Sequence, residues 1–167
     1  HGRDISQEVR SAVKLVSRSV GSDVGVTLKV SGPAPAMISG THLRQLVLNL
    51  VLNARDAAGE EPIRIHVTIG PAKEAPSNRD GADPSDWLCL KVSDNGVGMS
   101  GEVMEHIFEP FYTKKQFGSE RGTGLGLSVV YGIVESIGGH VGVQSTVGTG
   151  TTFLIYIPRS EVTEQPA

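Results

Sequence analysis

The sequence predicts an α+β fold, a two-layer α/β sandwich in which one mixed sheet is covered on one face by about three helices. Segments with apolar residues at helical spacing interleave with shorter segments of period two, and the extended segments come in pairs that indicate hairpins. With 38% hydrophobic and 20% charged residues, the composition is that of a globular domain. Hairpin pairs favour a mixed sheet over a purely parallel one, with its helices gathered on one face.

Two helices and two strands are expected early in the chain. Residues 4–20 carry apolar side chains at helical spacing, with Asp4 or Ser6 available as a cap. Residues 24–30 alternate between apolar and polar or glycine positions and predict a half-buried strand. After a turn rich in glycine and proline, we expect a short strand over residues 36–39 and a long helix over residues 40–58.

The rest of the chain is predicted to form two hairpins and one helix. Residues 63–69 and 87–92 are apolar strands, and the Pro-, Ser-, Asp- and Gly-rich segment between them is a long hairpin loop. Polar residues without periodicity fill the stretch before a helix over residues 124–137, which Gly138 and Gly139 end. The strands at 140–144 and 151–157 close the sheet. Residues 1–22 are expected as an N-terminal helix, 23–158 as one domain and 159–167 as a flexible tail.

Composition and charge exclude some classes of function. A net charge of −3 and a pI near 5.9 argue against a nucleic-acid-binding domain. A single cysteine, Cys89, cannot form an internal disulfide and is expected to pack as a small hydrophobe, which fits a reducing compartment. No apolar stretch approaches the roughly 20 residues of a membrane span, and the N-terminus is not a signal peptide. Because the chain opens without methionine, we expect a piece of a longer protein.

A glycine-rich segment, residues 121–128, is the first candidate site. Gly122, Gly124 and Gly126 leave backbone N–H groups unshielded where an apolar helix begins, which favours an anion such as phosphate. The alternative is a flexible turn that caps the helix. No Gly-Lys-Ser/Thr closes the segment, so it is not a Walker A loop, and no strand leads directly into it as a dinucleotide fingerprint requires.

Two asparagines form the second candidate site. Asn49 and Asn53 stand four residues apart and share one face of the predicted helix, whose other faces are apolar. Amide oxygens suit Mg²⁺, which keeps most of its waters and binds substrate phosphates. In the alternative interpretation, the two amides tie a strand end to the helix.

The third candidate site is the segment from Asp94 to Met99, directly after an apolar strand. A carboxylate at this strand end could accept a hydrogen bond from the exocyclic amine of adenine and so select adenine over guanine. Gly96 and Gly98 would let the backbone approach the base. The alternative is an ordinary Asx turn, which Asp-Asn-Gly forms readily.

Together these segments resemble the conserved boxes of two-component sensor histidine kinases. Residues 49–53 are similar to the N box, 94–99 to the G1 box, 108–111 to the F box and 122–127 to the G2 box, and 148–153 complete the set. In this order they resemble the catalytic and ATP-binding domain (HATPase_c) of a histidine kinase. That domain has the Bergerat fold and belongs to the GHKL superfamily, with type II topoisomerases, heat-shock chaperone ATPases and mismatch-repair ATPases.

The resemblance implies an ATP pocket between the mixed sheet and three helices, covered by a lid over residues 112–123. It implies that Asp94, assisted by Thr151, holds the adenine amine and that Asn53, helped by Asn49, binds Mg²⁺. Lys115 and Arg121 would add charge at the β- and γ-phosphates, although the lysines of this segment could also form a solvated loop. The remaining positions implied to contact nucleotide are Gly96, Gly98, Met99, Gly122, Thr123, Gly124, Leu125, Gly126 and Leu127.

Three further positions carry expectations. Phe108 and Phe111 are expected to pack the root of the lid rather than touch ATP. The family often has a basic residue where this chain has Asp56. A carboxylate cannot hold phosphate, so Asp56 is expected either to take a water beneath the adenine or to join a network with Arg55.

The residue at position 49 separates a kinase from an ATPase. Hydrolytic members of the superfamily carry a glutamate there as general base, and the Asn49 amide cannot accept a proton from water. Slow hydrolysis and transfer to a histidine are therefore implied, with Asn49 and Lys115 as the candidate catalytic residues. None of the chain's five histidines has the family's acceptor pattern. They are His1, His42, His66, His106 and His140.

The acceptor histidine is thus expected on an upstream dimerisation and phosphoacceptor domain or on another chain. A response regulator would be the next partner, and the domain itself is expected to be cytoplasmic and monomeric. Without an acceptor domain, it would not autophosphorylate. Two alternatives stay open: an ATP-driven clamp of the GHKL type, and a degenerate domain that binds nucleotide or a partner protein for regulation.

Overall fold

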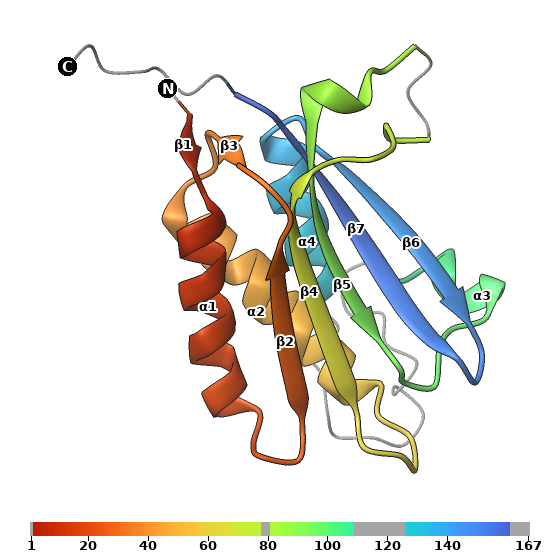
Figure 1. Cartoon of the computed structure of the whole chain (residues 1–167). Helices are drawn as coiled ribbons and strands as arrows, with labels where there is room; N and C mark the ends of the chain where they lie inside the picture. Colours follow the sequence, from red (N-terminus) through yellow and green to blue (C-terminus); the bar gives the residue numbers. More distant parts are fainter. Residues whose placement is uncertain (1, 78–80, 109–125, 161–167) are drawn as a thin grey trace.

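The computed structural model describes residues 2–77, 81–108 and 126–160 of the chain. Figure 1 shows one mixed sheet whose helices gather on one face. In chain order the elements are β1 (Arg3–Asp4), α1 (Ser6–Ser19), β2 (Gly25–Val30), β3 (Pro35–Ala36), α2 (Gly40–Asp56), β4 (Arg64–Pro71), the 3-10 helix η1 (Pro84–Asp86), β5 (Trp87–Asp94), α3 (Gly101–Met104), α4 (Gly126–Ser136), β6 (His140–Thr146) and β7 (Gly150–Pro158). The predicted α+β sandwich is confirmed.

The sheet has five strands in the order β2-β4-β5-β7-β6. β2 pairs in parallel with β4, and the remaining neighbours β4–β5, β5–β7 and β6–β7 pair antiparallel. The parallel pair requires a crossover connection, and α2 lies in the segment that joins β2 to β4. The sheet is mixed for this reason.

Side chains alternate between the two faces of the sheet, and one face is apolar. The buried residues of that face are Ile65, Val67, Ile69, Leu88, Leu90, Val92, Phe153, Ile155 and Ile157, and they belong to one core cluster with the helices. Because side chains on a strand repeat every second residue, Asp94 shares this face with Val92, and Thr151 shares it with Phe153. Asp94 and Thr151 are also register partners across β5 and β7. The strand pattern therefore turns both candidate residues toward the helices.

The three long helices cover the apolar face side by side, with α2 between α1 and α4 (Figure 1). Each contributes a buried apolar stripe: Val9, Ala12, Val13 and Val16 from α1, Leu43, Leu46, Val47, Leu50, Val51 and Ala54 from α2, and Val130, Ile133 and Val134 from α4. The Ser39 side chain caps α2 by accepting the His42 N–H at 3.1 Å. α2 lies in the middle of the helical layer because it packs against both α1 and α4. Among the described residues, no helix has the length and apolarity to cross a membrane.

Several boundaries differ from the predicted ones. Ile5, not Asp4 or Ser6, is the N-cap of α1, and it makes no side-chain cap bond, while Asp4 accepts the Ser6 N–H at 2.9 Å. The short strand is β3, which pairs with β1 in a small second sheet. It ends at Ala36 because the chain must turn to bring Ser39 to the start of α2.

The later elements also extend beyond or add to the predictions. β4 reaches Pro71, so the hairpin loop that follows it is slightly shorter than predicted. β5 begins at Trp87 as predicted and extends to Asp94 at its other end. α3 was not predicted, since four residues carry no periodicity; Ser100 caps it by accepting the Val103 N–H at 3.3 Å. α2 ends at Asp56, before the predicted Ala58.

Candidate functional site

Asp94 is the last residue of β5, and its carboxylate is held by the backbone. Oδ1 accepts the Gly96 N–H at 2.8 Å and the Thr151 N–H at 3.3 Å. The first contact is the Asx turn that the sequence allowed, and the second ties the carboxylate to the neighbouring strand. Asp94 is therefore oriented by two different segments, which suits a residue that must present a carboxylate in one fixed direction.

The glycines after Asp94 bring the loop against the protein's own backbone. A Cβ at Gly96 would lie 2.4 Å from the Ala57 carbonyl oxygen, and the Val97 N–H donates to that same oxygen at 2.8 Å. A Cβ at Gly98, where φ is +72°, would lie 2.1 Å from the Thr146 carbonyl oxygen. The sequence interpretation assigned the close approach to a base, whereas these contacts join the loop to the end of α2 and to the turn between β6 and β7.

The far end of the loop is fixed by a hydroxyl that the sequence interpretation missed. The Met99 N–H donates to Ser145 Oγ at 2.8 Å, and Ser145 Oγ lies 2.7 Å from Thr151 Oγ1. Thr151 itself is buried, with 4% of its surface exposed. The signal in the sequence was a serine that continues the inward-facing positions of Val141 and Val143.

Asn49 and Asn53 lie half-buried on α2, on the stripe that continues to Ala57. Ala57 contacts the Asp94 loop, so the stripe leads toward that loop. Neither side-chain amide forms a hydrogen bond with another described residue. Asn95 behaves differently, because its Oδ1 accepts the Arg64 N–H at 2.6 Å and its Nδ2 donates to the Pro62 carbonyl at 3.2 Å. Asn95 thus joins the end of β5 to the start of β4.

Asp56 takes part in an ion pair at the end of α2. Arg55 donates to Asp56 Oδ1 from Nε and from a terminal nitrogen, both at 3.3 Å. The side chains are 38% and 21% exposed, so the pair is partly screened by solvent. The expected contact of Asp56 with Arg55 is present in the structure.

Only part of the glycine-rich segment lies in the described chain. Gly126 and Leu127 are half-buried at the start of α4, and a Cβ at Gly126 would meet no described atom within 4 Å. The remaining predicted residues of this region lie outside the described residues: Lys114, Lys115, Arg121, Gly122, Thr123, Gly124 and Leu125, with the predicted lid.

Phe108 packs against protein, as expected. Its ring centroid lies 5.6 Å from that of Tyr131 on α4 and 6.4 Å from that of Phe153 on β7, the latter edge-on. Phe108 therefore joins α4 to the core next to β7. Phe111 lies outside the described residues.

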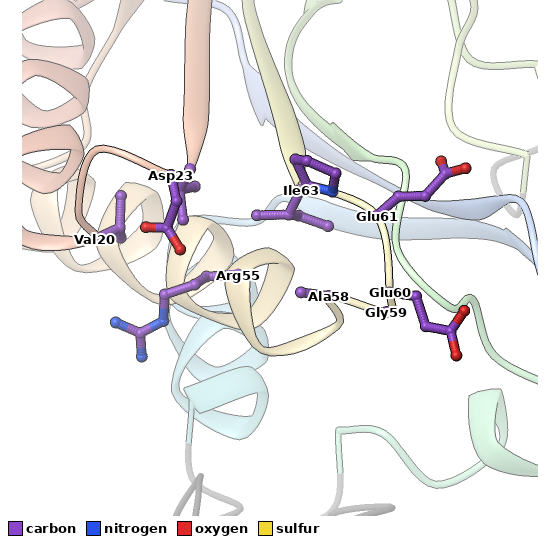
Figure 2. A pocket seen from close by; sticks show the side chains of 10 residues that line it. Val20, Asp23, Arg55, Ala58, Gly59, Glu60, Glu61 and Ile63 are labelled. Carbon is purple, nitrogen blue, oxygen red and sulfur yellow. The ribbon is translucent and has the colours of Figure 1, made fainter.

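A separate hollow lies where α2 ends and β2 and β4 begin (Figure 2). Asp23, Arg55, Glu60 and Glu61 contribute its charged side chains, and Figure 2 shows Glu60 and Glu61 pointing away from each other. None of the predicted nucleotide-binding residues lines it. The hollow is therefore distinct from the candidate site around Asp94.

The donor set at the candidate site fits a metal that is bound mainly through substrate phosphates. Across the described residues, no group of three or more His, Cys, Asp or Glu side chains could hold a metal ion. The two neutral amides of Asn49 and Asn53, which have no hydrogen-bond partner among the described residues, suit Mg²⁺ that keeps waters and phosphate oxygens, not a cage made wholly of protein carboxylates.

Residues 39–161 match the family described as "Histidine kinase-, DNA gyrase B-, and HSP90-like ATPase". The chain belongs to this family. Among curated proteins it is similar to the sensor kinase CckA of Brucella abortus, with 38% identity over 93% of this chain and 17% of that protein. It is also similar to the sensor histidine kinase ZraS of Escherichia coli K12, with 31% identity over 98% of this chain and 32% of that protein. The chain thus spans about a sixth to a third of the length of these relatives.

Solved structures share the fold. The mycobacterial sensor histidine kinase MprB has a TM-score of 0.77 at 24% identity, over 96% of this chain and all of that chain (100%). Full-length ShkA in complex with AMPPNP has a TM-score of 0.73 at 27% identity, over 95% of this chain and 30% of that chain. The resemblance to catalytic domains of sensor histidine kinases is confirmed, and kinase activity is supported at the level of the family.

Proposed function

We propose that this chain binds ATP with Mg²⁺ and donates the γ-phosphoryl group to a histidine on a separate phosphoacceptor domain. The observation that carries the proposal is the pairing of an oriented carboxylate, Asp94, with two amides on a helix stripe that leads to its loop. These amides, of Asn49 and Asn53, form no side-chain hydrogen bond with another described residue. The carboxylate is suited to binding a base, and the amides are suited to binding a metal and its phosphates.

The side of the site around Asp94 is proposed to recognise adenine. Its carboxylate, fixed through Oδ1, would accept the exocyclic amine, and guanine presents a carbonyl oxygen at that position, which would face the carboxylate unfavourably. Ser145 connects Met99, at the end of this loop, to Thr151. The close backbone approaches at Gly96 and Gly98 hold the loop in place. Base selectivity follows from hydrogen-bond polarity.

The side of the site on α2 is proposed to bind the metal. Asn53, helped by Asn49, would supply amide oxygens to Mg²⁺, whose charge would be shared with the phosphates. The N–H groups of residues 122–127, with Lys115 and Arg121, would complete phosphate binding; of these, Gly126 and Leu127 lie at the described start of α4. Asn49 and Lys115 are the candidate catalytic residues.

The choice of a kinase over a clamp-type ATPase rests on Asn49. An amide at this position cannot take a proton from water, so bound ATP awaits a better nucleophile. Phosphoryl transfer depends mainly on placement and charge stabilisation, which a domain without its own nucleophile can supply. Alone, the chain should bind ATP and hydrolyse it slowly.

The proposed partners follow from this division. The acceptor histidine would come from an upstream dimerisation and phosphoacceptor domain, to which residues 1–22 would lead, while 23–158 form the ATP-binding domain. A response regulator would receive the phosphoryl group next. The domain would act as a monomer in the cytoplasm, where ATP is available.

Phosphoryl transfer tests the proposal. The chain would be incubated with γ-labelled ATP and Mg²⁺, alone and together with the phosphoacceptor domain of its parent protein. We expect acid-labile, base-stable label on the acceptor domain, none on this chain, and little free phosphate. Rapid release of phosphate by the chain alone would favour the clamp ATPase, and binding without any transfer would favour the degenerate, regulatory alternative.

A further inference from the structure

Ser145 occupies a junction between three segments of the candidate site. Its Oγ accepts the Met99 N–H at 2.8 Å, lies 2.7 Å from Thr151 Oγ1 and lies 3.1 Å from the Gly150 carbonyl oxygen. Met99 belongs to the Asp94 loop, and Gly150 and Thr151 are the first two residues of β7, so Ser145 on β6 links three segments. From these contacts, and resting on the proposed function, we infer that Ser145 is a positioning residue for adenine recognition.

The register of the sheet puts Ser145 in line with the recognition residues. Asp94 pairs with Thr151, and Thr151 pairs with Ser145, so the three form one row across β5, β7 and β6. Their side chains face the helical layer, because each continues the apolar alternation of its strand. Cross-strand neighbours in such a row lie close enough to interact directly.

The hydroxyl chemistry explains what Ser145 does. A serine hydroxyl has one proton to donate and two lone pairs that accept. With the Met99 N–H taking one lone pair, the remaining capacity of Ser145 goes to Thr151 Oγ1 and to the Gly150 carbonyl. The Thr151 side chain is thereby held in one orientation beside Asp94, and the loop that carries Asp94 is held at its far end.

Close contacts at two glycines pack the Asp94 loop against the turn between β6 and β7, next to Ser145. Gly98 packs so closely that a Cβ there would lie 2.1 Å from the Thr146 carbonyl, and the Gly148 N–H donates to the Val97 carbonyl at 2.8 Å. The turn between β6 and β7 is therefore the platform on which the loop rests. Next to this turn, the Ser145 hydroxyl contacts both the loop, through the Met99 N–H, and Thr151, through Thr151 Oγ1.

The same sheet offers a matched control one residue away. Ser93 Oγ and Thr152 Oγ1 lie 2.9 Å apart in the adjacent row, and this pair faces the opposite side of the sheet. Ser93 and Thr152 directly precede and follow Asp94 and Thr151 in their strands. Ser93→Ala thus removes a similar hydroxyl pair without touching the recognition row.

The test is calorimetric titration of the chain with non-hydrolysable ATP and GTP analogues in the presence of Mg²⁺. We expect Ser145→Ala to weaken binding of the ATP analogue by about three- to tenfold and to reduce the preference over the GTP analogue. Ser93→Ala should bind within about twofold of the unmodified chain. Ser145→Thr keeps the hydroxyl and should also bind within about twofold.

A double-mutant cycle shows whether Ser145 acts through Thr151. In the Thr151→Val background, Ser145→Ala should have a smaller effect on affinity than in the unmodified chain, because the shared contact is already gone. Equal effects in both backgrounds, equal losses for Ser145→Ala and Ser93→Ala, or lost selectivity in Ser145→Thr would overturn the inference. If the unmodified chain binds no ATP analogue, the proposed function fails, and this inference fails with it.

Discussion

The two sides of the candidate site differ in how far the protein has already committed their polar groups. Around Asp94, the carboxylate, the loop backbone and the Ser145 hydroxyl all have protein partners. On α2, Asn49 and Asn53 have no side-chain hydrogen bond to another described residue. One side is held by contacts within the fold, whereas on the other side the two amides have no such contact with the described residues.

This difference separates two kinds of recognition. A base is rigid and uncharged, so it is read best by groups that are fixed in advance and lose nothing on binding. Phosphates bring their own metal and waters, so the protein needs only to leave suitable oxygens available. Changes at the Asp94 side should therefore alter stability and base selectivity, whereas changes on α2 should alter the dependence on Mg²⁺.

The largest effect is expected from a change that breaks the assembled side. Gly98→Ala adds a Cβ 2.1 Å from the Thr146 carbonyl at a residue with φ +72°, and we expect a loss of about 2–4 kcal/mol in the free energy of unfolding. Gly148→Ala is the control, because φ is +82° there but nothing lies within 4 Å. Urea unfolding should show the larger loss for Gly98→Ala; equal losses would mean that the loop does not rest on the turn.

Asp94→Asn tests base recognition at the same side. The amide oxygen can still accept the Gly96 and Thr151 N–H groups, but its NH₂ would meet the adenine amine donor to donor. We expect ATP binding to weaken about ten- to a hundredfold, or roughly 1.5–3 kcal/mol, with a small change in melting temperature. Calorimetric titration measures the affinity. An unchanged affinity would remove Asp94 from the base site.

Asn53→Ala tests the uncommitted side. It removes an amide without a described protein partner, so stability should change by about 0.5 kcal/mol or less. The gain in affinity that Mg²⁺ gives to an ATP analogue should fall by about tenfold, while adenosine binding stays nearly the same. Asn95→Ala is the contrasting variant, because it removes two strand-end hydrogen bonds and should destabilise the fold without altering the response to Mg²⁺. A weaker response to Mg²⁺ in Asn95→Ala, together with a loss of stability in Asn53→Ala, would contradict both assignments.

The smallest effect on the candidate site is expected at Cys89, which lies on β5 and is remote from both sides. Burial raises the pKa of this thiol from 9.0 to about 11, against the opposing charge of Lys91. Below pH 9 the thiol is protonated in both states; between about pH 9 and 11 the unfolded chain releases the proton first, so stability should fall as pH rises. Comparing urea unfolding of the unmodified chain and Cys89→Ala over this range measures the difference. An identical pH dependence would contradict the raised pKa.

The sequence predicts the main elements because their patterns are long. Alternation over residues 24–30 and helical spacing over residues 40–58 are fixed by burial on one face, and both appear near the expected bounds as β2 and α2. β1, β3 and α3 are too short to carry a period, and they depend on pairing or capping partners elsewhere in the chain. Tertiary contacts decide such elements.

The site residues also divide into those with a local sequence pattern and those that depend on tertiary contacts. Asp94 could be predicted as a site residue because a carboxylate at a strand end has a recognisable local pattern. For Ser145 the strand alternation gives only an inward-facing position. Its role could not be predicted, since it depends on the register between β6 and β7 and on where the Asp94 loop rests. The two interpretations of Asn49 and Asn53 depend on the hydrogen-bond partners of these side chains, which the sequence pattern does not give.

The central claim is an ATP–Mg²⁺ site with an assembled base side and a metal-dependent phosphate side. The most direct test is calorimetric titration of the unmodified chain with a non-hydrolysable ATP analogue, with and without Mg²⁺, beside a GTP analogue and adenosine. We predict adenine-selective binding that Mg²⁺ strengthens for the ATP analogue and leaves unchanged for adenosine. Absence of binding, or equal binding of the two nucleotides, would contradict the account.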